Sequence, residues 1–373
     1  MGNYKTTNLS MEGNRQVRYS KTIGRDFAGT LNKRVRAYFK ENNISRYANT
    51  EMKIKTVFMV CLLVIPLGFV LSGLIQSVWL VALMYFIMGL GTAGIGLSIM
   101  HDANHGAYSK KENVNKVLGR LLNLVGGFAP NWQIQHNVLH HTYTNVHGMD
   151  EDIMPPKILR FSPNEERKPI HRFQHLYAWF FYGLMTFSWV LTKDFQQYYR
   201  YKKMDLLKTV TDKPKALFVE LIITKVIYAT LYIVLPIIIL DIAWWWIPIF
   251  VFMLHFVSGL ILSMIFQPAH VVGDVEFVRV DESMTIENGF AIHQMNTTAN
   301  FAPRSNILYW LIGGLNFQVE HHLFPNICHV HYKKISKIVR ETAEEFGIPY
   351  HSHDTFAQAL KHHTRLLKSL GRA

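Results

Sequence analysis

Eight histidines of this 373-residue chain stand at spacings that suit metal binding. They occur in HDANH at 101–105, in HNVLHH at 136–141, in QVEHH at 318–322 and as the single His270. On a helix, positions i and i+4 share a face, so His101 and His105 can point two imidazoles in one direction. The same holds for His136 and His140, and each pair suits one metal ion.

The doubled histidines indicate a second ion. His141 and His322 each follow another histidine and are rotated by about 100° from it on a helix. Eight imidazoles are too many for one four-coordinate zinc site and suit a pair of borderline ions such as iron. The chain has only two cysteines, Cys61 and Cys328, which excludes a cysteine-bound iron–sulfur or zinc site. One H-x-x-x-H alone is weak evidence, but histidines clustered near membrane depth are costly unless they are paired or functional.

Long apolar runs precede these clusters. Residues 56–100 contain no Asp, Glu, Lys or Arg over 45 positions, whereas one membrane crossing needs about 20 residues. We therefore expect spans near 56–74 and 79–100. A second hairpin is expected over 217–267, with a tryptophan triplet at 244–246 in its turn, typical of a membrane interface.

The distribution of Lys and Arg orients the hairpins. Twelve lie in residues 1–55 and seven in 193–215, while the two hairpin turns have none, so the amino terminus is expected in the cytosol. Each pair of crossings returns the chain to that side, which places all four histidine groups on one face. The net charge of +13 is attributed to topology and anionic lipid headgroups rather than to nucleic-acid binding.

These patterns predict an all-α integral membrane protein in which four transmembrane helices form two hairpins and a cytosolic helical cap holds a di-metal histidine site. Three parts are expected: a basic cytosolic amino-terminal segment (1–55), a membrane and catalytic domain (56–330) and cytosolic carboxyl-terminal helices (331–373). The last part reads as two amphipathic helices, with Asp354 as the cap of the second.

Other features have simpler interpretations. Three shorter apolar stretches, 117–129, 176–191 and 307–317, are expected to be interfacial or core segments. The glycines at 89, 91, 94 and 96 favour close helix packing over passage of an acyl chain. His255 is interpreted as a hydrogen-bonded packing residue. Most of the remaining histidines are expected at the surface, with His329 and His331 left open: His147, His171, His175, His293, His329, His331, His351, His353, His362 and His363.

The three clusters resemble the histidine boxes of the membrane fatty acid desaturase family, and the resemblance covers about 56–350. GLNFQVEHHLFP at 314–325 is the most specific match, because Gln318 in place of a first histidine is similar to the front-end (Δ5/Δ6-type) branch. HHTYTNVHGMDED at 140–152 resembles the stretch after the second box. There Asn145, Asp150 and Asp152 are expected to support the ligands.

The resemblance implies a di-iron centre that activates dioxygen, takes two electrons from a small carrier and removes two hydrogens from adjacent methylenes of a fatty acyl chain. The implied ligands are His101, His105, His136, His140, His141, His270, His321 and His322. Because an amide oxygen is a weaker donor than imidazole, Gln318 is expected to bind weakly, hold a water or orient the site. The residues expected to accept imidazole N–H bonds are Asp102, Asn104, Asn137 and Glu320.

The resemblance also bears on partners and location. The substrate is expected to be a fatty acyl lipid or an acyl thioester, with coenzyme A, carrier protein and phospholipid all open as carriers. No fused cytochrome b5 domain is expected, because the first histidine of the chain is His101. A separate ferredoxin or cytochrome b5 would then supply electrons, steered by the basic surface. A bacterial inner membrane is favoured over the endoplasmic reticulum.

Two rival functions stay open at this point. A di-iron lipid or carotenoid hydroxylase or ketolase would use a similar oxidant and similar boxes. A membrane metal transporter or sensor is more distant, because it would need polar ligands inside the spans, whereas the clusters follow them.

Overall fold

Four helices long and apolar enough to cross a membrane dominate the computed structural model, which describes residues 17–373. They form two hairpins. The first hairpin joins α2 (Thr50–Leu71) to a continuous helix, Val78–Asn104, made of α3 (Val78–Gly94), the π-helical turn η1 (Ile95–Ile99) and α4 (Met100–Asn104). The second joins the helix Pro214–Ile239, made of α11 (Pro214–Ala229), η6 (Thr230–Val234) and α12 (Leu235–Ile239), to α13 (Trp246–His270). Both predicted hairpins are confirmed, and the chain is an integral membrane protein.

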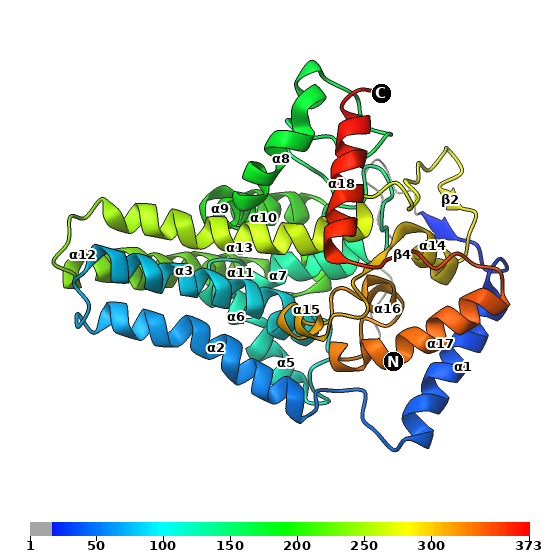
Figure 1. Cartoon of the computed structure of the whole chain (residues 1–373), viewed down its shortest axis with the longest axis horizontal. Coiled ribbons are helices and arrows are strands. Elements are labelled where there is room, and N and C mark those ends of the chain that lie inside the picture. The colour runs from blue at the N-terminus through cyan, green and yellow to red at the C-terminus, as the bar shows by residue number, and fades with distance from the viewer. Residues whose placement is uncertain (1–16) are drawn as a thin grey trace.

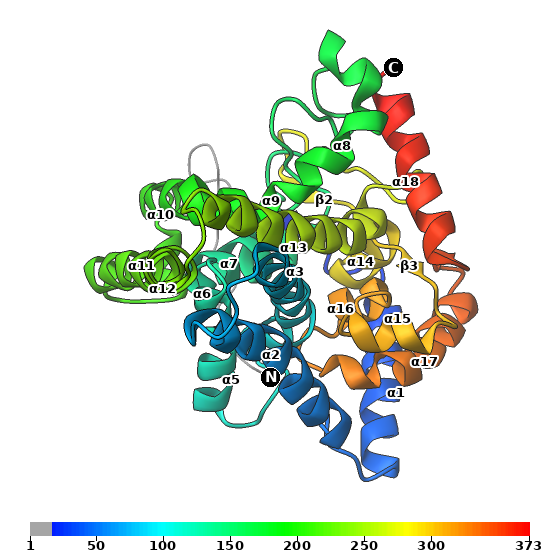
Figure 2. The ribbon, with the colours of Figure 1, turned by 60° about the vertical axis from the view of Figure 1, so that its left-hand side comes forward.

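The second span lies between its neighbours because small residues allow close contact. A Cβ on Gly91 would stand 2.8 Å from the Leu62 carbonyl carbon of α2, and one on Gly89 would stand 2.9 Å from the Leu254 carbonyl oxygen of α13. No larger side chain fits at either contact without a shift of backbone. Figure 2 shows α3 between α2 and α13. The packing interpretation of these two glycines is confirmed.

The remaining helices gather at one end of the hairpins (Figure 1). Along the chain, the elements between the two hairpins are α5 (Glu112–Gly119), α6 (Leu121–Leu124), α7 (Ala129–Trp132), η2 (Gln133–His140), η3 (Pro169–Phe173), α8 (Gln174–Gly183), α9 (Met185–Ser188), η4 (Trp189–Lys193), α10 (Asp194–Lys203) and η5 (Leu206–Thr209). After the second hairpin come α14 (Phe290–Thr297), α15 (Asn306–Leu311), α16 (Gln318–Leu323), η7 (His329–His331), α17 (Tyr332–Glu345) and α18 (Phe356–Leu370). None of the three shorter apolar stretches forms a span, as predicted.

Strands are few and short. Among the described residues, β1 (Arg18–Tyr19) pairs in parallel with β2 (Thr285–Ile286), and β3 (Asn300–Phe301) pairs in parallel with β4 (Ser352–His353). Each pair ties an end of the chain to the segment between α13 and α16. The protein is therefore all-α in class, as expected.

The two ends of the described chain pack onto the cap of short helices. The helix α1 (Arg25–Glu41) lies against α17, where Phe27, Leu31 and Val35 share a buried cluster with Ile335 and Val339. Both predicted carboxyl-terminal helices are present. The amino-terminal cap of the second helix, α18, is not Asp354 as predicted. The Thr355 hydroxyl caps it instead, by accepting a hydrogen bond of 3.1 Å from the Gln358 backbone N–H.

Four histidines that were expected at the surface are buried: His171, His293, His353 and His363. His329 and His331, which were left open, are also buried. The prediction failed because tertiary packing covers these rings, and several of them hydrogen-bond to groups that are far away along the chain. His363, for example, receives a hydrogen bond of 2.7 Å from the Tyr182 hydroxyl or donates one to it. His255 behaves as expected, since it is buried and lies 2.6 Å from the Tyr228 hydroxyl.

Candidate metal centre

All eight clustered histidines meet where four segments end. Box one lies at the last turn of the second span, box two on η2, His270 at the last residue of α13 and box three on α16. Each of the eight imidazoles is buried. The long spans therefore position two of the groups directly, and the cap supplies the others.

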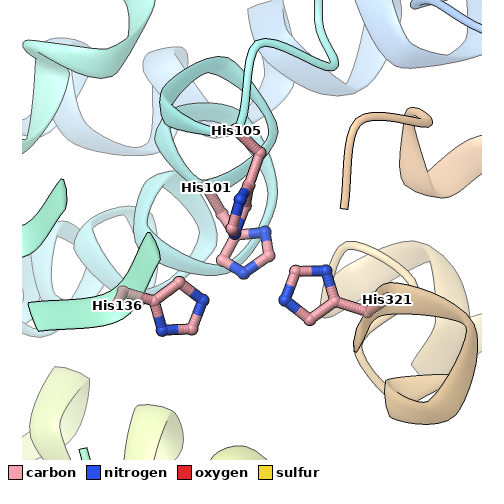
Figure 3. A group of neighbouring side chains, drawn as sticks. All are labelled: His101, His105, His136 and His321. Carbon is pink, nitrogen blue, oxygen red and sulfur yellow. The ribbon is translucent and has the colours of Figure 1, made fainter. Parts of the chain in front are cut away.

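The imidazoles form two groups joined by a bridging ring. In the four-imidazole group, ring nitrogens of neighbouring histidines lie within 4.8 Å of one another (Figure 3): His101, His105, His136 and His321. The three-imidazole group meets the same distance: His140, His270 and His322. His141 connects them, because its Nε2 lies 2.9 Å from His321 Nε2 and its ring stacks on His322 with centroids 4.4 Å apart.

The histidines of box two lie on or next to a π-helix, η2. In η2 the His141 N–H donates to the His136 carbonyl, five residues earlier, at 3.0 Å. This pattern widens the turn, so residues five apart align rather than residues four apart. His136 lies in the four-imidazole group and His140 in the three-imidazole group, and the two histidines also lie within 4.8 Å of each other together with Asp152. The pairing of His136 with His140 at one metal stays a prediction.

Carboxylates hold the outer nitrogens of box two. His140 Nδ1 lies 2.9 Å from both oxygens of Asp150, and His136 Nδ1 lies 2.5 Å from Asp152 Oδ2. Asp150 also accepts the backbone N–H groups of Asn145 at 2.9 Å and Asp152 at 3.0 Å. These bonds place a proton on Nδ1 and leave the Nε2 lone pair facing inward.

Neutral groups hold the other outer nitrogens. His322 Nδ1 lies 2.8 Å from Gln294 Oε1, and His321 Nδ1 lies 3.2 Å from the Tyr332 hydroxyl. His270 Nδ1 lies 3.3 Å from the Thr297 carbonyl oxygen. The sequence reasoning missed Gln294, Tyr332 and Thr297, and no local pattern identifies them.

The inward nitrogens fit a metal. In the eight clustered histidines, six buried imidazole nitrogens have no hydrogen-bond partner among the described residues: His101 Nδ1, His105 Nε2, His140 Nε2, His141 Nδ1, His270 Nε2 and His322 Nε2. Buried polar atoms in proteins are normally paired, and so many unpaired lone pairs in one place form the donor set of a cation. Imidazole is a normal ligand of borderline ions, including iron.

Burial keeps these rings available as ligands. Desolvation, followed by repulsion between neighbouring rings, holds five pKa values well below the usual range of histidine: those of His105, His136, His141, His321 and His322. At neutral pH these rings are neutral, which is the form that binds a metal. Burial also lowers the pKa of His140, but the charge of Asp150 outweighs it and raises the pKa overall.

Other predicted residues have different partners. Asn137 donates to the Asn104 carbonyl oxygen at 2.9 Å. Glu320 accepts hydrogen bonds from Asn300 at 2.8 Å and from Tyr350 at 2.9 Å. The prediction that Asn137 and Glu320 accept imidazole N–H bonds is wrong, because their neighbours in the fold point them away from the rings.

Three more polar residues lie around the centre. The Asn104 Oδ1 accepts a hydrogen bond from Gln133 at 2.9 Å, and Asn145 donates to the His270 carbonyl oxygen at 2.9 Å. Asp102 Oδ1 is 3.7 Å from His101 Nδ1. Its Oδ2 is closer to His329 Nδ1, at 2.8 Å, and Lys55 Nζ lies 2.8 Å from the other nitrogen of that ring. The sequence did not predict this buried series of contacts from Lys55 through His329 to Asp102.

A cavity of about 630 Å³ opens beside the four-imidazole group. His101, His136 and Gln318 are among the residues that line it, so the cavity and the centre share two histidines. Its walls are mainly apolar, including Gly96 and Phe266, whereas Gln196, Arg200 and Glu151 also line it. The volume and lining suit a long apolar ligand with a polar end.

Comparison with known proteins supports one family. The family model for fatty acid desaturase matches residues 28–354. The chain is 36% identical to an sn-1 linoleoyl-lipid 6-desaturase of Arthrospira platensis, over 95% of each chain. It is also 36% identical to an sn-1 linoleoyl-lipid 6-desaturase of Synechocystis sp., over 94% of this chain and 97% of the relative. An acyl-lipid (8-3)-desaturase of Physcomitrium patens is 34% identical over 95% of this chain and 74% of its own length.

Proposed function

The chain belongs to the fatty acid desaturase family, and on that premise we propose that it is a di-iron acyl-lipid desaturase of the front-end type. The convergence of eight buried imidazoles, six with an unpaired nitrogen, is the observation that carries this proposal. Overall, an acyl –CH₂–CH₂– unit, O₂, two electrons and two protons would yield –CH=CH– and two water molecules.

The ligands we propose are His101, His105, His136 and His321 for one iron and His140, His270 and His322 for the other, with His141 between them. When bound, the iron pair supplies the reactivity with O₂ that removal of hydrogen from an unactivated methylene requires. Asp150 and Asp152 would hold the box-two rings in the ligating tautomer. Buried walls would exclude water from the centre.

We propose that the cavity holds the acyl chain. Its apolar walls run beside His101 and His136, so a bound chain would pass the centre sideways. Gln318 would contact the acyl chain in the cavity or orient the ligands of the metal centre. The names of the relatives support an acyl lipid substrate and a new double bond near the carboxyl end of the acyl chain.

We further propose that the centre lies on the cytosolic side, in a bacterial inner membrane. The twelve basic residues of 1–55 support this orientation through the positive-inside rule. A separate ferredoxin or cytochrome b5 would dock on the basic surface. If so, added salt should slow turnover; reduction that is insensitive to salt would contradict electrostatic docking.

Expression in a host without polyunsaturated lipids tests the function. Gas chromatography with mass spectrometry should find new double bonds close to the carboxyl end. His321→Ala should abolish them, whereas His147→Ala, which removes an exposed imidazole from the loop after box two, should not. Two irons per purified chain are expected, and their removal should abolish activity. Hydroxylated products alone, or full activity without iron, would contradict the proposal.

A further inference from the structure

A second cluster of metal-type side chains lies outside the eight-histidine centre. It joins Asp274, in the loop after α13, to His353 on β4 and His362 on α18. His353 Nε2 and His362 Nδ1 each lie 3.6 Å from the same atom, Asp274 Oδ2. The centroids of the two rings lie 4.6 Å apart, with the ring planes tilted by 47°. Three ligand-type atoms from three separate segments therefore converge.

The distances favour a metal site over hydrogen-bonded ion pairs. Charge-assisted N–H···O contacts are about 2.7–2.9 Å long, and both N···O distances here are well beyond that range. In a tetrahedral zinc site with bonds of about 2.0–2.1 Å, neighbouring ligand atoms lie about 3.4 Å apart. The two N···O distances of 3.6 Å are close to this value.

An unpaired buried nitrogen points to the same conclusion. The His353 side chain is 4% exposed, and its Nε2 has no hydrogen-bond partner among the described residues. A buried polar atom without a partner is costly. Burial and then the nearby His362 lower the pKa of His353, which favours the neutral ring.

The surrounding fold holds the three ligands in place. β4 pairs with β3, and the Ala302 N–H donates to the His353 carbonyl oxygen at 2.9 Å. Next to His362, His363 Nδ1 donates to the Val271 carbonyl oxygen at 2.7 Å, three residues before Asp274. The cluster is thus built on a fixed frame. Its outer side is open, because the side chains of His362 and Asp274 are 30% and 46% exposed, which leaves room for water as a further ligand.

We propose that Asp274, His353 and His362 bind a divalent transition-metal ion such as Zn²⁺. Two imidazoles and one carboxylate are a usual set of protein ligands for such an ion. The ion would link α18 and β4 to the loop that follows His270, and so would fasten the carboxyl-terminal end of the chain beside the main centre.

Zn²⁺ titration of the purified, iron-loaded, full-length protein tests this site. The parent should bind one Zn²⁺ beyond its iron. Asp274→Asn and His362→Gln, which change volume little, should each weaken that binding at least tenfold, whereas the exposed His147→Gln should not. Zn²⁺ should also slow proteolysis of residues 351–373 in the parent and not in the two variants.

Iron content gives an independent check that the main centre is intact in the variants, since none of the three residues belongs to it. No Zn²⁺ bound beyond the iron, or equal affinity in the parent and both variants, would overturn the proposal. Neither result would affect the proposed desaturase function.

Discussion

His140 and His322 belong to the same three-imidazole group, yet different chemistry holds them from behind. The carboxylate of Asp150 faces His140 Nδ1 at 2.9 Å, whereas the amide oxygen of Gln294 faces His322 Nδ1 at 2.8 Å. The pKa of His140 is raised, because the charge of Asp150 outweighs burial, while burial and neighbouring rings leave the pKa of His322 well below its usual range. Similar geometry therefore produces imidazoles of different basicity.

This contrast suggests a division of labour in the centre. A carboxylate that accepts the outer N–H of an imidazole makes the inner nitrogen a stronger metal ligand and fixes the tautomer of the ring. A neutral acceptor mainly fixes the orientation of the ring. Box two is backed by two carboxylates and box three by an amide and a phenol. Box two should accordingly contribute more to metal affinity, and variants of the four supporting side chains should differ in a definite order.

Asp150→Asn should have the largest effect. Asp150 holds His140 and two backbone N–H groups, and removal of such a partner typically costs up to about 100-fold in metal affinity or activity. Iron per chain and turnover, measured on purified protein, check this. The exposed Asp205→Asn serves as control; parent-like iron content in Asp150→Asn would remove the basis of the comparison.

Asp152→Asn should reduce turnover about tenfold, which is the lower end of the range for loss of a hydrogen-bond partner behind a metal ligand. Asp152 holds His136 but few other groups, and its side chain is 11% exposed, so water can partly replace it. Turnover assays of both aspartate variants, prepared side by side, test the order. A greater loss for Asp152→Asn than for Asp150→Asn would reverse it.

Gln294→Leu should cost about fivefold, the value of roughly one neutral hydrogen bond. The loss is limited because the Thr144 hydroxyl oxygen lies 3.3 Å from His322 Nδ1 and can accept a hydrogen bond from its N–H. Gln294→Glu is the matched variant, since it gives His322 a carboxylate, and it should retain more iron than Gln294→Leu. Equal iron loss in Gln294→Leu and Asp150→Asn would show that charge behind the ring is unimportant.

Tyr332→Phe should have the smallest effect, about twofold in turnover, because a neutral contact of 3.2 Å is worth only about 0.5 kcal/mol. The ring itself stays in its buried cluster. Turnover and thermal unfolding, with the exposed Tyr199→Phe as control, provide the measurement. A loss of iron in this variant as large as that in the aspartate variants would contradict the expected order, because the neutral phenol would then matter as much as a carboxylate.

Much of the fold was predictable because it depends on local patterns. The uncharged run of 56–100 and the apolar run of 217–267 predicted both hairpins to within a few residues. The return of each hairpin to the same side likewise predicted that all four histidine groups lie on one face. The division of the imidazoles was not predictable, because it depends on the π-helix at Gln133–His140, which shifts the alignment from four residues to five.

The supporting side chains show the same limit. Asp150 and Asp152 follow box two within a few residues, so their approach to it could be expected from the motif. Gln294 and Tyr332 contact box three from other helices, and no spacing relates them to it. Residues next to a ligand in the chain were poor guides, since Asn137 and Glu320 point to partners elsewhere.

By itself, the sequence determined that this protein spans a membrane in two hairpins and carries three histidine boxes of the desaturase type, because hydrophobic length and residue spacing act over a few helical turns. Only the tertiary structure decided which imidazoles lie together, which groups hold them, and that Asp274, His353 and His362 converge. These outcomes depend on the packing of segments far apart along the chain, where a shift of an ångström or a turn changes which atoms meet.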